Sequence, residues 1–157
     1  QDDAELLAYT IVPAEDTPAD TGPICITQRD VAALLQAKGV IFSALQIVLA
    51  RAGRQMTDVR RFFLAGGFAR HIDLDNAVAM GLLPDVDRSR YSFIGNGSLG
   101  GAVLAVIDSE VRAGLDRLAA APEVIELNLD PGFMEAYTMA MFLPNGDPTL
   151  FPSVEVR

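Results

Sequence analysis

The sequence predicts an α/β fold in which strands alternate with helices. Two apolar runs typical of strands, 61–65 and 91–94, each lead into a glycine-bearing turn, and a helical pattern follows each turn. Glycine lacks a Cβ, so it admits positive φ and lets main-chain N–H groups approach a phosphate or a flat ring. Because ligands favour the carboxyl ends of strands in such folds, the two turns indicate a ligand, for which we favour a nucleotide.

The composition predicts one ordered domain over residues 1–157. Half of the residues are apolar, which is enough to bury a core. The formal net charge of −9 argues against sequence-independent binding to nucleic acid or to an anionic membrane, because either would need a basic face. Apolar runs of eight residues or fewer are shorter than a membrane span, and no secretory signal is visible. We therefore expect a cytoplasmic protein.

Cysteine usage limits the metal chemistry of the chain. Cys25 is the single cysteine, so the chain cannot form an intramolecular disulfide, and one thiol cannot hold an iron–sulfur cluster or a zinc ion by itself. We predict no metal ligand within this sequence, and any metal centre of a parent protein would lie elsewhere.

The first third of the chain predicts a hairpin-like start and a long helix. An extended segment over 6–12, a proline-rich acidic loop and a short strand over 24–26 lead to Thr27, which fits a capping box with Asp30. The helix is expected to run to Gly53. Its apolar stripe is expected to face the core and consists of Val31, Leu34, Leu35, Ile41, Phe42, Leu45, Val48, Leu49 and Ala52.

Lys38 falls on that stripe, where the pattern favours an apolar side chain. Its stem could pack against apolar neighbours while the ammonium reaches the edge, or the side chain could border a cleft and meet a ligand. Gln28 and Asp30 carry the same ambiguity, since capping accounts for Asp30 without any ligand. These alternatives stay open at the level of sequence.

The second half predicts further alternation of strands and helices. We expect a buried central strand over 61–65, a short helix capped by Asp73 and closed by Gly81, and a strand over 91–94. One long helix should then run from the Gly97 turn to just before Pro122. Beyond it we expect a half-exposed edge strand over 124–129, a short helix over 133–141, and a chain break at 144–148.

The segment Gly95-x-Gly97-x-x-Gly100 matches the dinucleotide-binding fingerprint in form. That site also expects an acidic residue near the end of the next strand, about twenty residues on. The nearest candidates, Glu126 and Asp130, come about thirty residues after Gly97. The sequence therefore does not favour a dinucleotide site.

Several separated motifs resemble a known family. These are Ile26-Thr27-Gln28-Arg29-Asp30-Val31, Gln36-Ala37-Lys38-Gly39, Phe63-Leu64-Ala65-Gly66-Gly67-Phe68-Ala69, Ala79-Met80-Gly81-Leu82-Leu83-Pro84 and Gly95-Asn96-Gly97-Ser98. In order and type they are similar to the C-terminal part of the reductive activators of corrinoid proteins. Those activators join a ferredoxin-type iron–sulfur domain to an ATPase of the superfamily of actin, sugar kinases and heat-shock chaperones. The resemblance implies the second lobe of an actin-like, ribonuclease H-like ATPase, with a mixed sheet and helices on its faces.

The resemblance also implies the cofactor-binding residues. In that superfamily a strand followed by a Gly-Gly-x-Ala-like turn lies against the adenosine of ATP, which matches Gly66, Gly67, Phe68 and Ala69, and the helix carrying Lys38 flanks the adenine side. We add to this predicted set Gln28, Asn96, Gly97 and Ser98. For Asn96, a turn role and a ligand contact stay open, and for Ser98 a helix N-cap is preferred. We predict no catalytic residue, and we expect a structural or exposed role for His71.

The same resemblance implies a function for a longer parent protein. Phosphate-binding loops, magnesium-organising carboxylates and cluster cysteines are not visible here, so we expect a partial C-terminal lobe with its core over 24–143 and a tail over 144–157, unable to hydrolyse ATP alone. The parent would use ATP with Mg and a 2Fe–2S cluster to reduce an inactive cob(II)amide corrinoid protein of a methyltransferase system to cob(I). A homodimer, an ATPase activating another radical or dehydratase enzyme, and a non-enzymatic interaction module are the open alternatives.

Overall fold

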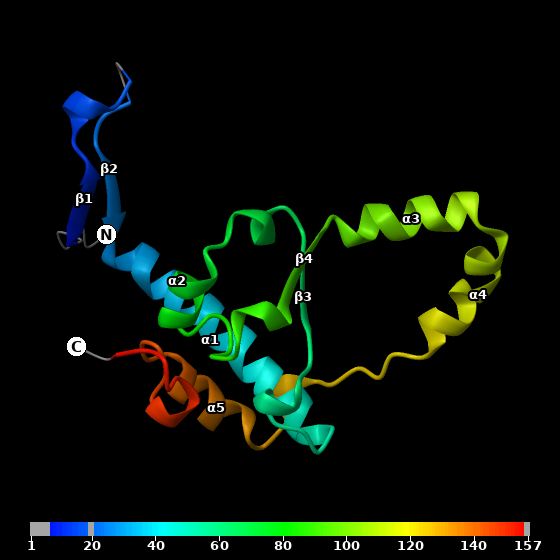
Figure 1. Cartoon of the computed structure of the whole chain (residues 1–157). Helices are drawn as coiled ribbons and strands as arrows, with labels where there is room; N and C mark the ends of the chain where they lie inside the picture. The colour runs from blue at the N-terminus through cyan, green and yellow to red at the C-terminus, as the bar shows by residue number, and fades with distance from the viewer. Residues whose placement is uncertain (1–6, 19–20, 156–157) are drawn as a thin grey trace.

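The computed structural model describes residues 7–18 and 21–155 and confirms the α/β class. Figure 1 shows a hairpin, a central body and a projecting arm. The hairpin pairs β1 (Ala8–Val12) with β2 (Ile24–Thr27), and the arm consists of α3 (Gly97–Ile107) and α4 (Ser109–Ala120). The body contains α1 (Gln28–Arg51), β3 (Phe62–Ala65), α2 (Leu74–Ala79), β4 (Tyr91–Gly95) and α5 (Phe133–Ala140).

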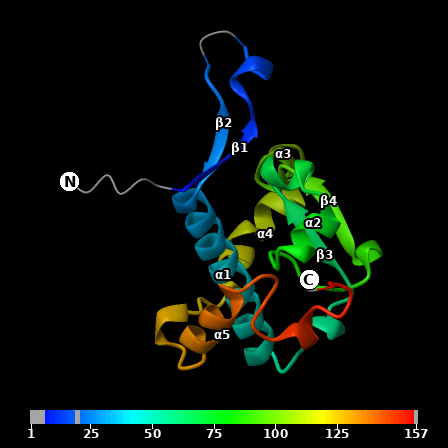
Figure 2. The ribbon, with the colours of Figure 1, turned by 90° about the vertical axis from the view of Figure 1, so that its left-hand side faces the viewer.

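The long helix α1 forms as its end signals predict. The Thr27 hydroxyl accepts a hydrogen bond from the Asp30 N–H, and the Asp30 carboxylate accepts one from the Thr27 N–H, which is a complete capping box. Gly53 follows the helix with φ at +65°, a conformation that favours glycine. Figure 2 shows the hairpin standing off the first turn of α1, and α5 lying alongside its second half.

The buried face of α1 differs from the predicted stripe. It consists of Lys38, Gly39, Phe42, Ser43 and Ile47. Of the predicted stripe only Phe42 is buried, whereas Ile41 is 52% exposed and Val48 is 46% exposed. The helix is apolar on more than one side, so its periodicity does not distinguish the face that packs on α5 from faces that the described residues leave uncovered.

The hydrophobic core brings together residues of α1, α2, α5 and the C-terminal segment. Phe42, Val78, Ala140 and Phe151 form the buried cluster. The rings of Phe42 and Phe151 lie with centroids 5.2 Å apart, so the segment after 143, which we expected as a tail, contributes to the core. Gly39 lets α5 approach α1 closely, because a Cβ there would lie 3.1 Å from the Tyr137 ring.

The strands β3 and β4 form a two-stranded parallel sheet in which Phe62 pairs with Tyr91. The prediction that β3 is a buried central strand is wrong for the described residues, since Phe63 is 59% exposed. Parallel pairing has one consequence for function, because the carboxyl ends of both strands lie at the same edge.

The predicted single helix after Gly97 is wrong, because the chain turns at Asp108. Asp108 is extended, with φ at −120°, and its carboxylate accepts hydrogen bonds from the N–H groups of Glu110 and Val111. It therefore ends α3 and caps α4. The apolar pattern continues across both helices, so periodicity alone misses the break.

The predicted strand over 124–129 is also wrong. The described structure has an irregular segment there that closes with a 3-10 turn at Leu127–Leu129. Alternation of apolar and polar residues favours a strand only where a partner edge is present to bond its backbone. Among residues 7–18 and 21–155, no strand pairs with this segment.

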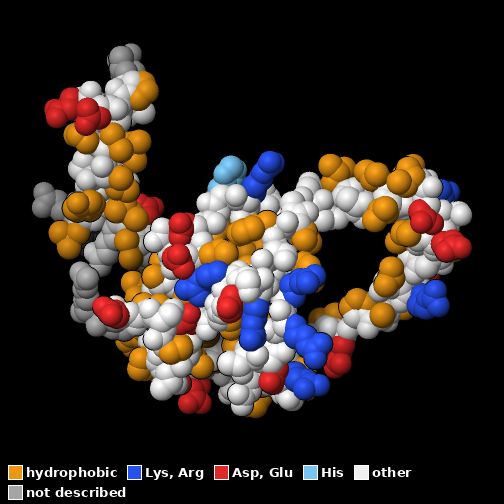
Figure 3. Space-filling model, in the orientation of Figure 1, with side chains coloured by type: hydrophobic (Ala, Val, Ile, Leu, Met, Phe, Trp, Pro, Cys, Tyr) orange, Lys and Arg blue, Asp and Glu red, His pale blue; other side chains and the backbone are white. Residues whose placement is uncertain are grey.

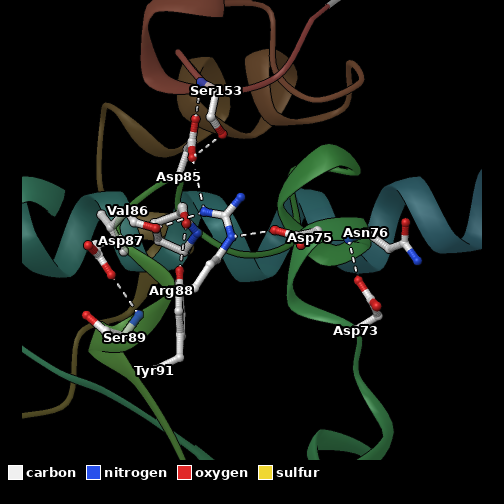
Figure 4. A network of polar contacts seen from close by, with 11 residues as sticks. Asp73, Asp75, Asn76, Asp85, Val86, Asp87, Arg88, Ser89, Tyr91 and Ser153 are labelled. Carbon is white, nitrogen blue, oxygen red and sulfur yellow. Dashed lines mark hydrogen bonds and ion pairs between the residues drawn. The ribbon is translucent and has the colours of Figure 1, made fainter.

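A polar network ties the loop after α2 to the C-terminal segment (Figure 4). The Asp85 carboxylate, 4% exposed, accepts hydrogen bonds of 2.6 Å from both the N–H and the hydroxyl of Ser153. Arg88 donates to Asp85 at 3.2 Å and to Asp75 at 2.9 Å. Burial acts to raise the pKa of Asp85, but the hydrogen bonds from Ser153 and Arg88 outweigh it and hold that pKa below its ordinary value.

By length and composition, α1 is the one helix of the described residues that could cross a membrane. Core helices of globular domains meet the same criterion, which makes this weak support for a span.

Candidate nucleotide-binding edge

The two glycine turns lie side by side at one edge of the β3–β4 sheet. The Gly66 N–H donates a 2.7 Å hydrogen bond to the Gly95 carbonyl, and Ala65 is the register partner of Gly95. Gly66 has φ at +96° and Gly95 has φ at +66°. Both conformations favour glycine, because an L side chain would crowd its own carbonyl. The turns predicted separately therefore form one continuous stretch of bare backbone.

This edge is open in the described structure. A Cβ added at Gly66, Gly67 or Gly95 would meet no atom within 4 Å. Gly67 has φ at −65° and ψ at −39°, an ordinary helical conformation that any residue adopts. Neither backbone conformation nor packing among the described residues explains glycine at position 67. Glycine at this position leaves room for the close approach of an external group.

A helical segment begins directly after each turn. Phe68–His71 forms a 3-10 turn in which Ala69 is 6% exposed and anchors the segment, whereas the Phe68 ring is 77% exposed. After the second turn α3 begins, and its first N–H groups have no partner within the helix. The residues 66–69, which the resemblance assigns to nucleotide binding, and the residues 96–98, which we added to the predicted set, thus lie around one exposed edge.

The cap of α3 is Asn96 rather than the preferred Ser98. The Asn96 side-chain oxygen accepts a 3.0 Å hydrogen bond from the Leu99 N–H. Ser98 is the second residue of the helix and is exposed. Asn96 therefore has a turn role in this structure, while the N–H of Gly97 and the hydroxyl of Ser98 face no partner among the described residues.

Lys38 lies elsewhere and is fully buried, at 0% exposure. Its ammonium donates hydrogen bonds to the carbonyl oxygens of Phe142 and Pro144, the second at 2.7 Å. Burial lowers the pKa of Lys38 to about 8. The ammonium does not reach the edge of the domain, so that expectation is wrong. In this structure its hydrogen bonds hold the 142–144 backbone, and a ligand contact for Lys38 stays a prediction.

Gln28 is exposed at the first position of α1, and its N–H donates a 2.9 Å hydrogen bond to the Leu7 carbonyl. The described contacts place its backbone at the base of the hairpin and leave the role of its side chain as predicted. His71 is exposed as well, and Figure 3 shows the single histidine projecting from the upper surface of the body. Among the described residues, no three His, Cys, Asp or Glu side chains gather as metal ligands would.

The sequence reasoning missed the partners of Lys38. The carbonyls it holds lie 104 and 106 residues further along the chain, so no local pattern links them. The sequence contains one signal of this packing, which is the glycine in the motif Ala79-Met80-Gly81-Leu82-Leu83-Pro84. A Cβ at Gly81 would lie 1.9 Å from the Pro144 oxygen and 3.0 Å from the Lys38 ammonium nitrogen.

This chain resembles known proteins in sequence and in fold. The chain is 34% identical over 131 residues to the corrinoid activation enzyme RamQ of Eubacterium limosum, a match that covers 83% of this chain and 22% of RamQ. A solved structure described as a reductive activator for a corrinoid, iron–sulfur protein superposes with a TM-score of 0.85 at 32% identity, over 94% of this chain and 23% of that one. The chain thus spans less than a quarter of the length of either relative.

A family model matches nearly the whole chain. The model described as the C-terminal domain of RACo, the ASKHA domain, matches residues 1–155. The match includes the hairpin, the body, the arm and the C-terminal segment. This chain belongs to the family of RACo C-terminal ASKHA domains.

Proposed function

We propose that this chain is the ATP-binding C-terminal part of a reductive activator that reduces a cob(II)amide corrinoid protein to cob(I) for methyl transfer. One observation carries the proposal: two open glycine turns, hydrogen-bonded to each other, lie at the carboxyl ends of two parallel strands. Such an edge suits a nucleotide because it offers bare backbone and unpaired N–H groups together. The relatives named as corrinoid activators supply the reaction class.

The residues present fit an adenine nucleotide. Adenosine would lie flat on the backbone at Gly66 and Gly67, where no side chain fills the space. The N–H groups at Gly97 and Ser98 begin α3 and would attract an anionic phosphate through the positive end of the helix dipole. In a chain of net charge −9 this attraction has to be local. We leave Lys38 out of the site because its ammonium is already bound to two carbonyls.

The iron–sulfur cluster does not fit this chain. Cys25 is its single cysteine and is exposed, and a 2Fe–2S cluster needs four protein ligands. We therefore assign the cluster, the Mg-organising carboxylates and the phosphate loops to parts of the full-length protein beyond these 157 residues. The nucleotide would bind one arrangement of the full-length protein more tightly than another. This difference in binding free energy can drive an otherwise unfavourable electron transfer.

Titration of the full-length protein with ATP tests the nucleotide site. Gly67→Asp places a carboxylate where the phosphates and adenosine would approach, without backbone strain or steric clash. We expect its ATP affinity to fall by about tenfold or more, since like-charge repulsion and lost space act together. Gly114→Asp is the matched control, because it adds the same charge on α4 at a glycine that also has no atom within 4 Å.

The two variants separate a local effect from a general one. Equal affinity in Gly67→Asp and in the wild type would refute the nucleotide edge, and so would an equal loss in Gly114→Asp. The reaction class needs its own measurement, which is ATP-dependent formation of cob(I) followed by its absorbance in a mixture with the corrinoid protein. Normal ATP binding without cob(I) formation would favour activation of a different enzyme.

A further inference from the structure

Two cavities meet on the face of the body where α1 ends and β3 begins. The first has a volume of about 490 Å³ and is mainly apolar, with walls that include Phe42, Leu49, Met56, Pro84 and Leu150. The second has a volume of about 480 Å³ and is lined by Leu49, Arg54, Asp58, Val59 and Arg60. Leu49 and Arg54 line both cavities, so the two cavities are adjacent. We call the pair the α1–β3 groove, with an apolar end and a basic end.

The basic end carries positive charge that the described residues leave unpaired. Arg54 and Arg60 are exposed, and neither has a hydrogen-bond or ion-pair partner among residues 7–18 and 21–155. Asp58, the acid in the same wall, accepts a hydrogen bond from the Gln55 N–H, and its negative charge offsets part of the positive charge of Arg54 and Arg60. Arg90 adds to the charge while its guanidinium donates to the carbonyls of Thr57 and Val59.

This concentration contrasts with the rest of the chain, which carries a net charge of −9. Figure 3 shows Lys and Arg side chains gathered over the lower part of the central body. Arginine pairs well with carboxylates because its planar fork offers parallel N–H donors. The charge of the groove is therefore complementary to an acidic surface.

The apolar end contains a buried acceptor without a donor. Gln46 lines this end, and its side-chain oxygen is buried with no hydrogen-bond partner among the described residues. An unsatisfied buried acceptor is costly, so an occupant that carries N–H donors is favoured over one that has none. A polypeptide segment provides such donors in its backbone, whereas a lipid acyl chain does not.

We propose that the α1–β3 groove docks an acidic segment of the corrinoid protein, with a bulky apolar side chain in the apolar end and carboxylates on Arg54 and Arg60. This inference rests on the proposed function, from which it takes the identity of the partner. Buried apolar anchors beside arginine are typical of interface residues that dominate binding.

The groove and the nucleotide edge lie at opposite ends of one strand. Arg60 comes just before β3 and Gly66 just after it, and four residues of strand span about 13 Å. A partner in the groove and a nucleotide at the glycine turns can therefore bind at the same time. The strand β3 joins the two sites directly.

The test uses the full-length protein and the purified corrinoid protein of the same methyltransferase system in its cob(II) state. Arg60→Glu reverses one groove charge, and Arg117→Glu makes the same change at an exposed, unpartnered position on α4. We expect Arg60→Glu to weaken association by about tenfold at low salt and to flatten its salt dependence, and Arg117→Glu to change it by less than about twofold.

Three outcomes of this association measurement count against the inference, and two further probes accompany it. Equal association of Arg60→Glu and wild type, equal loss in Arg117→Glu, or no association of the wild type would each overturn it. Vesicles of mixed phosphatidylserine and phosphatidylcholine form a second probe, and binding to them that Arg60→Glu abolishes would assign the groove to a membrane instead. ATP titration of the same variants keeps the nucleotide site separate, since Arg60→Glu should leave ATP affinity unchanged while Gly67→Asp lowers it.

Discussion

Glycine serves opposite purposes in two regions of this domain. Around the 142–146 loop the space beside glycine is filled, because a Cβ at Gly81 would lie 1.9 Å from the Pro144 oxygen and one at Gly146 would lie 2.8 Å from Met139. At the proposed nucleotide-binding edge a Cβ at Gly66 or Gly67 would meet no atom within 4 Å. The first region is complete within the described residues, whereas the second leaves room for a group from outside. The environment of a glycine therefore separates a packed position from an open one.

The largest loss of stability is expected from a substitution in the packed region. Gly81→Ala introduces a Cβ against the Pro144 carbonyl in a residue with φ at +72°. Left-handed strain and overpacking each cost about 1 to 3 kcal/mol, so we expect the free energy of unfolding to fall by about 3 kcal/mol or more. Urea denaturation followed by circular dichroism measures it. A loss below about 1 kcal/mol would contradict the observed packing.

Lys38→Met is the next test of the packed region. Methionine fills the volume of the lysine stem but leaves the carbonyls of Phe142 and Pro144 without their buried donor. Methionine removes the cost of burying a charge, but the loss of the two hydrogen bonds is larger. We therefore expect the free energy of unfolding to fall by about 2 kcal/mol. A variant as stable as the wild type would show that the two carbonyls find other donors.

The pH dependence of stability identifies the Lys38 ammonium directly. Burial lowers its pKa from the ordinary 10.5 to about 8 in the folded state. Between these two values the unfolded chain binds more protons, so the contribution of Lys38 makes stability rise with pH. We expect the wild type to gain stability relative to Lys38→Met from about pH 8 to pH 10, and the two to run parallel below pH 8. Subtracting the stability of Lys38→Met from that of the wild type cancels the contributions of other titrating groups. One of these is Tyr91, whose pKa is raised by burial.

Local chemistry predicted the ends of elements and the glycine turns. The Thr27–Asp30 capping box, the Asp73 cap and the two strands before the turns depend on neighbours in sequence, and the structure contains them. The buried face of α1 could not be predicted in the same way, because that helix is apolar on several sides. The role of Lys38 depends on carbonyls more than 100 residues away. Tertiary contact decided these two points, whereas the break between α3 and α4 comes from the local cap at Asp108.

Regions that lack a covering partner show a further limit of the sequence. The helix α3 contains no charged residue, yet none of its residues is buried, and Figure 1 shows the arm standing away from the body. A helix that is apolar all round is normally covered. Because this chain spans 23% of the solved relative, we expect residues outside it to cover α3.

Gly66→Ala sharpens the comparison at the open edge. The residue has φ at +96°, so alanine is strained there, but its Cβ meets no atom within 4 Å. We expect a loss of about 1 to 2 kcal/mol from strain alone, smaller than for Gly81→Ala. The same denaturation experiment measures both variants. If Gly66→Ala cost as much as Gly81→Ala, the edge would be packed rather than open.

Gly67→Ala is expected to have the smallest effect on stability and the most informative one. Its helical backbone, with φ at −65° and ψ at −39°, accepts alanine without strain, and the added methyl group meets no atom within 4 Å. Restricting the unfolded chain should raise the free energy of unfolding by about 0.4 to 1 kcal/mol. In the full-length protein the same methyl group would intrude on adenosine, so ATP affinity should fall while stability rises. Opposite signs in the two measurements separate a binding surface from a packing position, and a rise in stability with unchanged ATP affinity would leave glycine at position 67 without a functional reason.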